Sequence, residues 1–210
     1  MIVFFFKDIL KIKFNKTRYM ILLSGIFGFL ALCIITYTFQ ISKNIRIKSF
    51  SDWNQDSCLI AEILKKDIIL NLNDGQALGW SGEIKKIIKN YENRFLLRLI
   101  SWGDADMINF YNHHNNFILP LAAEKKPCGE TYAYNLKQWG CNFTLPFSSM
   151  HKYVREDSIK MNKFTTPLKF HYEKFNNKFG EMLPAFVKWD SLKNDYKKIN
   201  PKENLNESKS

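Results

Sequence analysis

The feature that most constrains this 210-residue chain is an uncharged apolar run from Tyr19 to Phe39, YMILLSGIFGFLALCIITYTF. As an α-helix, these 21 residues would be about 31 Å long, which matches the hydrocarbon core of a bilayer. Tyr19 and Tyr37 lie near the two ends, where aromatic rings prefer the membrane interface. A helix that is apolar on every face for six turns is unusual in a water-soluble domain. The run therefore predicts one transmembrane helix.

The sequence around this run favours a helix that stays in the membrane over a cleaved signal peptide or a lipid attachment site. The run is longer than the apolar part of a cleaved leader, and no A-x-A sequence follows it. Lipidation at Cys33 would require a small residue just before it, and Leu32 stands there. Residues 19–39 are therefore interpreted as an uncleaved signal-anchor.

The basic residues on the two sides of the run predict its orientation. Five precede it (Lys7, Lys11, Lys13, Lys16 and Arg18), and three follow it closely (Lys43, Arg46 and Lys48). Because the more basic side usually faces the cytoplasm, the N-terminus is expected there and the main domain in the periplasm or outside the cell. The expected segments are a basic cytoplasmic segment 1–18, a juxtamembrane connector 40–50, an extracytoplasmic domain 51–197 and a disordered tail 198–210.

The net charge of +11 does not indicate nucleic-acid binding. Only five of the 31 basic residues are arginine, the better phosphate ligand, and they are scattered along the chain. The expected partners are the lipid bilayer and other membrane or envelope proteins, and self-association is left open.

The periodicity of apolar residues after residue 50 predicts helices mixed with antiparallel strands. Together they indicate one compact α+β domain. The expected helices are 51–66, 82–94 (starting at Ser81), 148–157 and 180–196. The expected strands are 67–73, 94–102, 115–122 and 168–175, with a turn at Asn73–Gly75 and a hairpin over 131–147 that turns at Lys137–Gly140.

Cysteine spacing predicts a disulfide between Cys128 and Cys141 if the domain lies in an oxidising compartment. A loop of this length would stabilise the fold by about 3 kcal/mol. A different pairing that involves Cys58, or no bridge at all, are the alternatives. No C-x-x-C pair exists, so a zinc site is not expected.

The stretch WGDADMINFYNHHNN contains the candidate catalytic residues Asp104, Asp106, His113 and His114. Carboxylates and imidazoles could hold a metal ion or activate water. However, two adjacent histidines cannot point the same way on a strand or a helix. A polar loop is therefore the favoured interpretation, with no metal and no cofactor expected. His151 and His171 stand alone and are interpreted as structural or exposed.

The absence of a convincing catalytic set favours a binding function over an enzymatic one. The leading hypothesis is a membrane-anchored scaffold or assembly component of an envelope complex. Tyr132, Tyr134 and Trp139 are its expected interaction surface. The alternatives are a membrane-anchored hydrolase using Asp104, Asp106 and a nearby histidine, and an auxiliary subunit of a channel or transporter.

Overall fold

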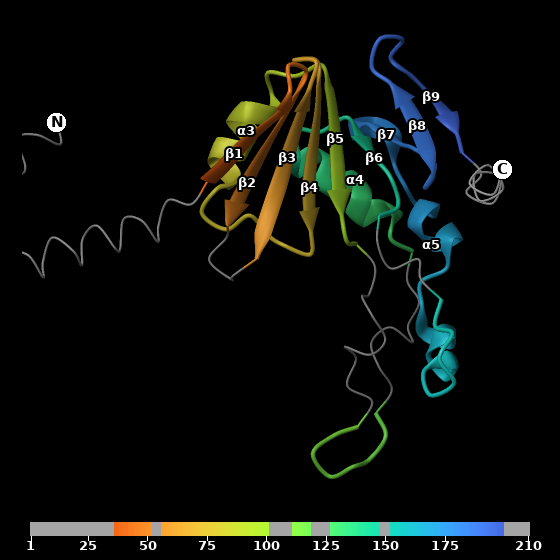
Figure 1. Ribbon diagram of the computed structural model, residues 1–210. Helices are drawn as coiled ribbons and strands as arrows, with labels where there is room; N and C mark the ends of the chain where they lie inside the picture. The colour runs from red at the N-terminus through yellow and green to blue at the C-terminus, as the bar shows by residue number, and fades with distance from the viewer. Residues whose placement is uncertain (1–35, 52–55, 101–110, 119–126, 148–151, 200–210) are drawn as a thin grey trace, which may run out of the picture. The chain divides into compact units, whose positions relative to one another are not determined.

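Seven strands form one sheet in the order β1-β2-β3-β4-β5-β6-β7 in the computed structural model (Figure 1), which describes residues 36–51, 56–100, 111–118, 127–147 and 152–199. The strands are β1 Thr36–Ser42, β2 Ile45–Ser51, β3 Ser57–Ile63, β4 Asp67–Asn73, β5 Asn93–Arg98, β6 Phe143–Thr144 and β7 Glu181–Met182. A second sheet is the hairpin of β8 Val187–Asp190 and β9 Asp195–Lys198. The α-helices are α3 Ser81–Ile88, α4 Gly129–Trp139 and α5 Leu168–Tyr172, and the 3₁₀ helices are η3 Ile159–Phe164 and η4 Asn177–Phe179.

The chain divides into two units, Met1–Thr36 and Tyr37–Ser210, and the fold described here is that of the second. Most of the predicted signal-anchor, residues 19–35, lies outside the described residues, as do the basic segment 1–18 and residues 200–210 of the predicted tail. The end of the predicted anchor, Thr36–Phe39, lies in β1 instead, and the predicted connector 40–50 contains the rest of β1 and most of β2. Among the helices that the structure describes, none combines the length and the apolar character needed to cross a bilayer.

The sheet changes from antiparallel to parallel pairing at β4. Strands β2, β3 and β4 form an antiparallel meander, in which Ile60 of β3 lies opposite Leu70 of β4. β5 then runs parallel to β4, with Ile69 opposite Phe95, and the remaining pairs β5–β6 and β6–β7 are parallel too. Parallel neighbours require a crossover connection, which α3 supplies between β4 and β5. The predicted compact α+β domain is confirmed, but its sheet is mixed and not antiparallel as predicted.

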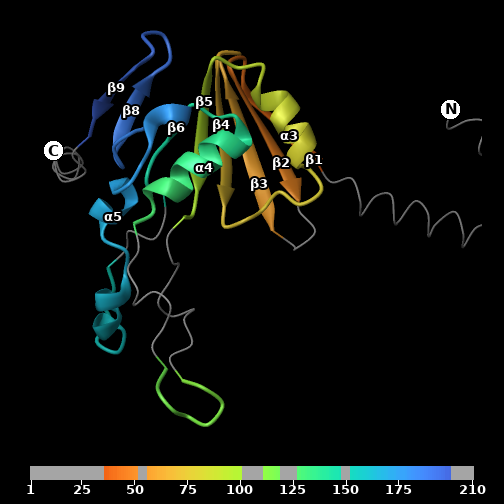
Figure 2. The same ribbon diagram turned by 180° about the vertical axis from the view of Figure 1, so that it is seen from behind.

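Helices α3 and α4 cover one face of the sheet, which we call the helix-covered face (Figure 2). In β4 the alternate residues Ile68, Leu70 and Leu72 point to this face and are fully buried. Residues of α3, α4, β2, β3 and β5 complete the core, together with two residues of the connections, Ala77 before α3 and Cys141 after α4. Those in the helices and strands are Phe50, Cys58, Ile60, Ile84, Ile88, Leu96, Leu136 and Trp139.

The opposite face, which we call the open face, is covered in part by the β8–β9 hairpin, which contacts β4, β5 and β6. The ring of Trp189 lies 4.9 Å from that of Phe95 and 5.1 Å from that of Phe143. Further from the hairpin, Ile47 of β2 is half-buried and Leu59 of β3 is 36% exposed. The two faces of the sheet are therefore closed to different degrees.

Several elements differ from the predictions. The predicted helix 51–66 contains the strand β3, because its residues alternate between the two faces of the sheet. The predicted hairpin over 131–147 is instead the helix α4 followed by the short strand β6. The predicted strand 168–175 contains α5, and the predicted helix 180–196 forms β7, β8 and the start of β9.

Other predictions are confirmed or tested in part. Strand 67–73, the helix from Ser81 and a strand starting near Arg94 are confirmed, although α3 ends at Ile88 and β5 at Arg98. Of the predicted strand 115–122, the described part contributes only a bridge between Phe117 and Tyr111. The described part of the predicted helix 148–157, residues 152–157, is not helical.

The start of α4 is fixed by a close backbone approach at Gly129. A Cβ atom at this position would lie 2.3 Å from both the Glu173 oxygen and the Phe175 nitrogen of the backbone that follows α5. Gly129 N–H donates to the Glu173 carbonyl at 3.1 Å, so the two segments are also hydrogen-bonded. Only glycine fits between them without a backbone shift.

Substitution of Gly129 by alanine should therefore lower the free energy of unfolding by about 3 kcal/mol or more, because backbone atoms must move. The matched control is Gly82→Ala in α3, where an added Cβ meets no atom within 4 Å. This control should leave stability unchanged or raise it by about 0.5 kcal/mol. Thermal unfolding of the full-length protein would measure both, and equal effects would contradict the packing argument.

Glu62 joins β2 and β3 on the helix-covered face by an ion-pair cluster. Its carboxylate is 5% exposed, binds the guanidinium of Arg46 and lies 3.2 Å from the ammonium of Lys48. Burial raises the pKa of Glu62, but the hydrogen bonds from Arg46 and Lys48 outweigh it, and the pKa is lowered overall. The ionised carboxylate therefore stabilises the folded state.

Glu62→Gln should lower the free energy of unfolding by about 2 kcal/mol at pH 7. Because the folded-state pKa lies below the ordinary value of 4.5, this stabilisation is present above pH 4.5 and is lost as the pH falls through the folded-state pKa. Urea unfolding of wild type and variant at several pH values measures the difference. Glu83→Gln, in an exposed pair with Lys86, is the control and should have little effect.

Candidate functional site

The predicted catalytic residues are not brought together in the described part of the chain. Asp104 and Asp106 lie outside the described residues. His113 and His114 are both exposed on a turn, with ring centroids 3.8 Å apart, and the His114 N–H donates to the Asn112 side-chain oxygen. Within the described ranges, no group of three or more His, Cys, Asp or Glu residues is arranged to hold a metal ion.

The structure does not bring Cys128 and Cys141 together. Cys128 precedes the first residue of α4, and Cys141 follows Gly140, which ends the helix in a left-handed conformation at φ 67°. Thirteen residues of helical rise separate the two Cα atoms by roughly 19 Å, whereas a disulfide needs about 4.4–6.8 Å. Both thiols are buried, and burial raises the pKa of Cys141 to about 12. The predicted disulfide is therefore not formed in this fold.

The predicted interaction surface lies mostly in the core. Tyr132 is 1% exposed and Trp139 is 7% exposed, because Tyr132 packs against His171 of α5 and Trp139 belongs to the core cluster. Only Tyr134, which is 60% exposed, lies on the outer side of α4. In a hairpin Tyr132 and Tyr134 would share a face, but in a helix they are about 200° apart. Because this segment is a helix and not a hairpin, Tyr132 and Trp139 are buried and only Tyr134 remains on the surface.

Tyr132 and His171 form a buried polar pair between α4 and α5. The Tyr132 hydroxyl lies 2.9 Å from His171 Nδ1, and it also accepts a hydrogen bond from the Phe147 backbone. The hydroxyl proton is therefore available to Nδ1, which leaves the ring proton on Nε2. That buried nitrogen has no hydrogen-bond partner among the described residues. Burial lowers the pKa of His171, so the ring stays neutral.

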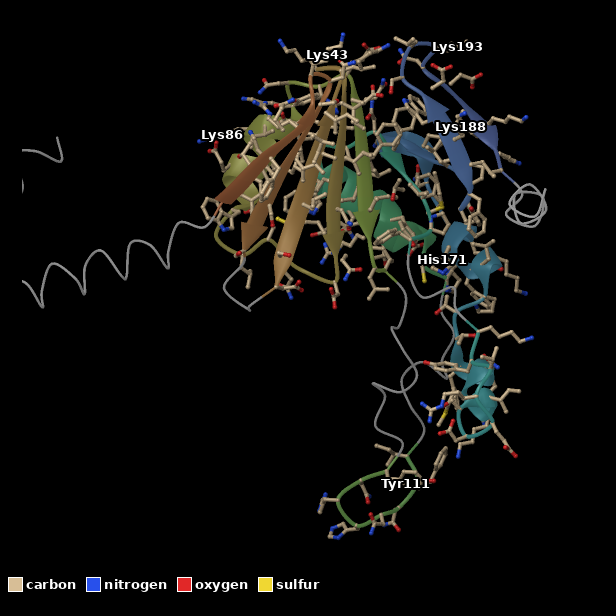
Figure 3. All side chains as sticks on the ribbon, viewed as in Figure 1. Lys43, Lys86, Tyr111, His171, Lys188 and Lys193 are labelled. Carbon is tan, nitrogen blue, oxygen red and sulfur yellow. The ribbon has the colours of Figure 1, made fainter. Side chains whose placement is uncertain are left out.

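This pair has a structural role, because the contacts around it fasten α5 to the start of α4. The Cys128 N–H donates to the Phe170 carbonyl at 2.8 Å. Figure 3 shows His171 on α5. Of the two interpretations of this histidine, structural or exposed, the structure supports the first, whereas His151 lies outside the described residues.

His171 should make stability depend on pH. Because its folded-state pKa lies below the ordinary 6.5, the unfolded chain takes up a proton first, and stability falls as the pH decreases below about 6.5. In His171→Asn, which keeps an acceptor for the Tyr132 hydroxyl, this decrease should be smaller. Thermal unfolding between pH 7.5 and 5 would measure it. An unchanged pH dependence in the variant would show that another group is responsible.

Exposed lysines are distributed over several elements. Lys43 lies in the β1–β2 turn, Lys86 in α3, Lys188 in β8 and Lys193 in the β8–β9 turn (Figure 3). Lys193 approaches Asp190, and Lys86 approaches Glu83. Two of these four lysines therefore lie near a carboxylate of their own segment.

The outer edge of β1 is the candidate interface that remains. β1 is the first strand in the sheet order, and within the described ranges no strand pairs with its outer side. Its sequence, TYTFQIS, contains no charged residue, proline or glycine. Phe39 is 55% exposed and Ile41 is 61% exposed. A seven-residue edge of this composition is a template for pairing with another chain.

The residue types of β1 carry a strand signal that the uncharged run overlaps. Residues 36–39 belong to the predicted membrane helix because they are uncharged. However, Thr36, Tyr37, Thr38 and Phe39 are β-branched or aromatic residues, which favour strands.

Comparison with known proteins finds no match for the chain among protein-family models, curated proteins or solved structures.

Proposed function

We propose that this protein is a single-pass membrane protein whose domain, outside the cytoplasm, binds an extended segment of another membrane or envelope protein. The segment adds to the sheet as a strand at the outer edge of β1. The protein thereby serves as a scaffold or assembly component, without catalysing a reaction. The observation that carries this proposal is the edge position of β1: no strand in the described part of the chain pairs with its outer side, and its sequence has no charged residue or proline.

Edge strands in natural proteins are commonly protected by charged side chains, proline, a bulge or short length. β1 is seven residues long and has none of these side chains. Its backbone N–H and C=O groups on the outer side can pair with an added strand, as in known complexes that form by strand addition. Main-chain hydrogen bonds would supply affinity, and contacts with exposed side chains such as Ile41 would supply specificity.

The sequence immediately before β1 supports a partner in the same membrane. Residues 19–35 precede β1 without a connector, and as a helix they would be about 26 Å long, within the range for a bilayer crossing. Two proteins held in one bilayer meet at a raised effective concentration, so a modest edge contact is sufficient for association.

Hydrogen–deuterium exchange of the full-length protein tests the proposal. Amides of residues 36–42 should exchange about tenfold or more slowly in native membranes than in purified monomer, because half of them gain partners. Equal exchange rates in the two samples would contradict strand addition.

Ile41→Lys should abolish the extra protection, because a charged side chain on the edge opposes pairing. The matched control is Leu192→Lys, which makes the same change at a residue 84% exposed in the β8–β9 turn and should leave protection intact. If vesicles that contain only this protein already protect residues 36–42, the added strand comes from a second copy and not from another protein.

A further inference from the structure

A cleft of about 280 Å³ lies between the open face of the sheet and the β8–β9 hairpin. Ile69, Phe95 and Leu97 line its sheet side, and Val187 and Trp189 line its hairpin side. These residues come from strands far from β1 in the sheet order, so the cleft is separate from the proposed edge interface. At about 30 Å³ per water-sized group, the cleft has room for on the order of ten non-hydrogen atoms.

One charged side chain, Asp67, lines this apolar cleft. Asp67 is 1% exposed. One carboxylate oxygen accepts a hydrogen bond from the Asn93 side-chain amide at 2.7 Å, and the other accepts from the Trp189 indole N–H at 3.0 Å. Both donors are neutral. The ammonium of the neighbouring Lys66 donates to the Ser191 carbonyl at 3.0 Å instead.

The two hydrogen bonds to Asp67 supply no counter-charge for its carboxylate. Each of its two oxygens accepts from a neutral group, so neither bond brings a positive charge next to it. A buried carboxylate is costly unless a cation accompanies it. Among the described residues, the ion pairs involve other carboxylates, those of Glu62, Glu83, Asp157 and Asp190, and none involves Asp67.

The aromatic wall next to Asp67 is suited to a cation. Phe95, Phe143 and Trp189 pack against one another with ring centroids 4.9–5.1 Å apart. Aromatic faces attract ammonium groups and at the same time accept apolar surface. A carboxylate and aromatic rings beside an apolar cleft are the groups that recognise an amine with an apolar body.

We propose that this cleft binds a small organic cation, with its ammonium group paired to the Asp67 carboxylate and its apolar body against Phe95 and Trp189. The cation supplies the missing counter-charge, and the carboxylate keeps two of its four lone-pair sites for it. The hairpin side of the cleft is held in place by the same Trp189 hydrogen bond, so binding also reinforces the hairpin's contact with the sheet.

Three probes that share a phenyl ring and differ in the head group test the proposal: 2-phenylethylammonium, 2-phenylethanol and phenylacetate. Each is titrated by calorimetry into the full-length protein in lipid nanodiscs, with empty nanodiscs as the blank. The ammonium should bind about tenfold tighter than the alcohol, because only it pairs with a carboxylate, and phenylacetate should bind most weakly. Equal affinities for ammonium and alcohol, or tighter binding of phenylacetate, would overturn the proposal.

Two variants locate the binding in the cleft. Asp67→Asn removes the carboxylate and places an NH₂ group against one of its two donors, so it should weaken 2-phenylethylammonium about tenfold more than it weakens 2-phenylethanol. Leu97→Phe fills the cleft and should weaken both probes. The matched control is Asp195→Asn, which removes an exposed carboxylate from the same hairpin and should change neither. Full ammonium affinity in Leu97→Phe would place the site elsewhere, and this result decides the question even if Asp67→Asn releases the hairpin.

Discussion

Burial of one side of β4 against α3 and α4 is the interaction on which the rest of the domain depends. Ile68, Leu70 and Leu72 are each 0% exposed. Burying three such side chains stabilises the fold by several kcal/mol, since each contributes roughly 1.5–3 kcal/mol. Because β4 pairs antiparallel with β3 and parallel with β5, these residues also fix where the meander ends and where a crossover helix must pass. The sheet order follows from that requirement.

The two faces of the sheet are closed by different kinds of interaction. On the helix-covered face, apolar side chains from two helices fill the space above the strands. On the open face, polar contacts hold the hairpin: Asp67 accepts from Trp189, and the Asn93 amide also donates to Asn194 in the β8–β9 turn at 2.9 Å. Hydrogen bonds fix the position of the hairpin without filling the space beneath it. The apolar cleft next to Asp67 is therefore a consequence of how the hairpin is attached.

Both proposed binding regions involve the sheet, the outer edge of β1 and the cleft under the hairpin. Neither uses the aromatic residues of α4 that the sequence suggests as a contact surface. Tyr132, Tyr134 and Trp139 of α4 are the expected contact surface, yet Tyr132 and Trp139 are buried. Recognition at β1 would instead use backbone groups, which any residue supplies, and the distinguishing feature is the absence of protective side chains. A surface of this kind cannot be recognised from its residue types alone.

Elements with a strong local signal were predictable from the sequence. Strand 67–73 alternates clearly and ends in Asn73-Asp74-Gly75, where Asn73 adopts φ 49° and the Gly75 N–H bonds to the Leu72 carbonyl. The helix from Ser81 places Ile84 and Ile88 one turn apart on its buried side. The sequence of α4 also carried a helical signal, since Tyr132, Leu136 and Trp139 recur at helical spacing and Gly140 follows. However, Tyr132 and Tyr134 also alternate as in a strand, and this alternation favours the hairpin that the sequence predicts.

The sequence by itself determined three things: the uncharged run before β1, the α+β class, and the elements whose apolar spacing fits only one kind of secondary structure, such as strand 67–73 and the helix from Ser81. Only the tertiary structure decided the rest. Leu59, Ile60 and Ile63 fit a helix as well as a strand, and pairing with β2 and β4 selected the strand. The burial of Asp67 and the cleft beside it arise from segments up to 122 residues apart in sequence, and the edge position of β1 arises from the strand order. Such contacts depend on how strands are ordered in the sheet, which local propensity does not specify.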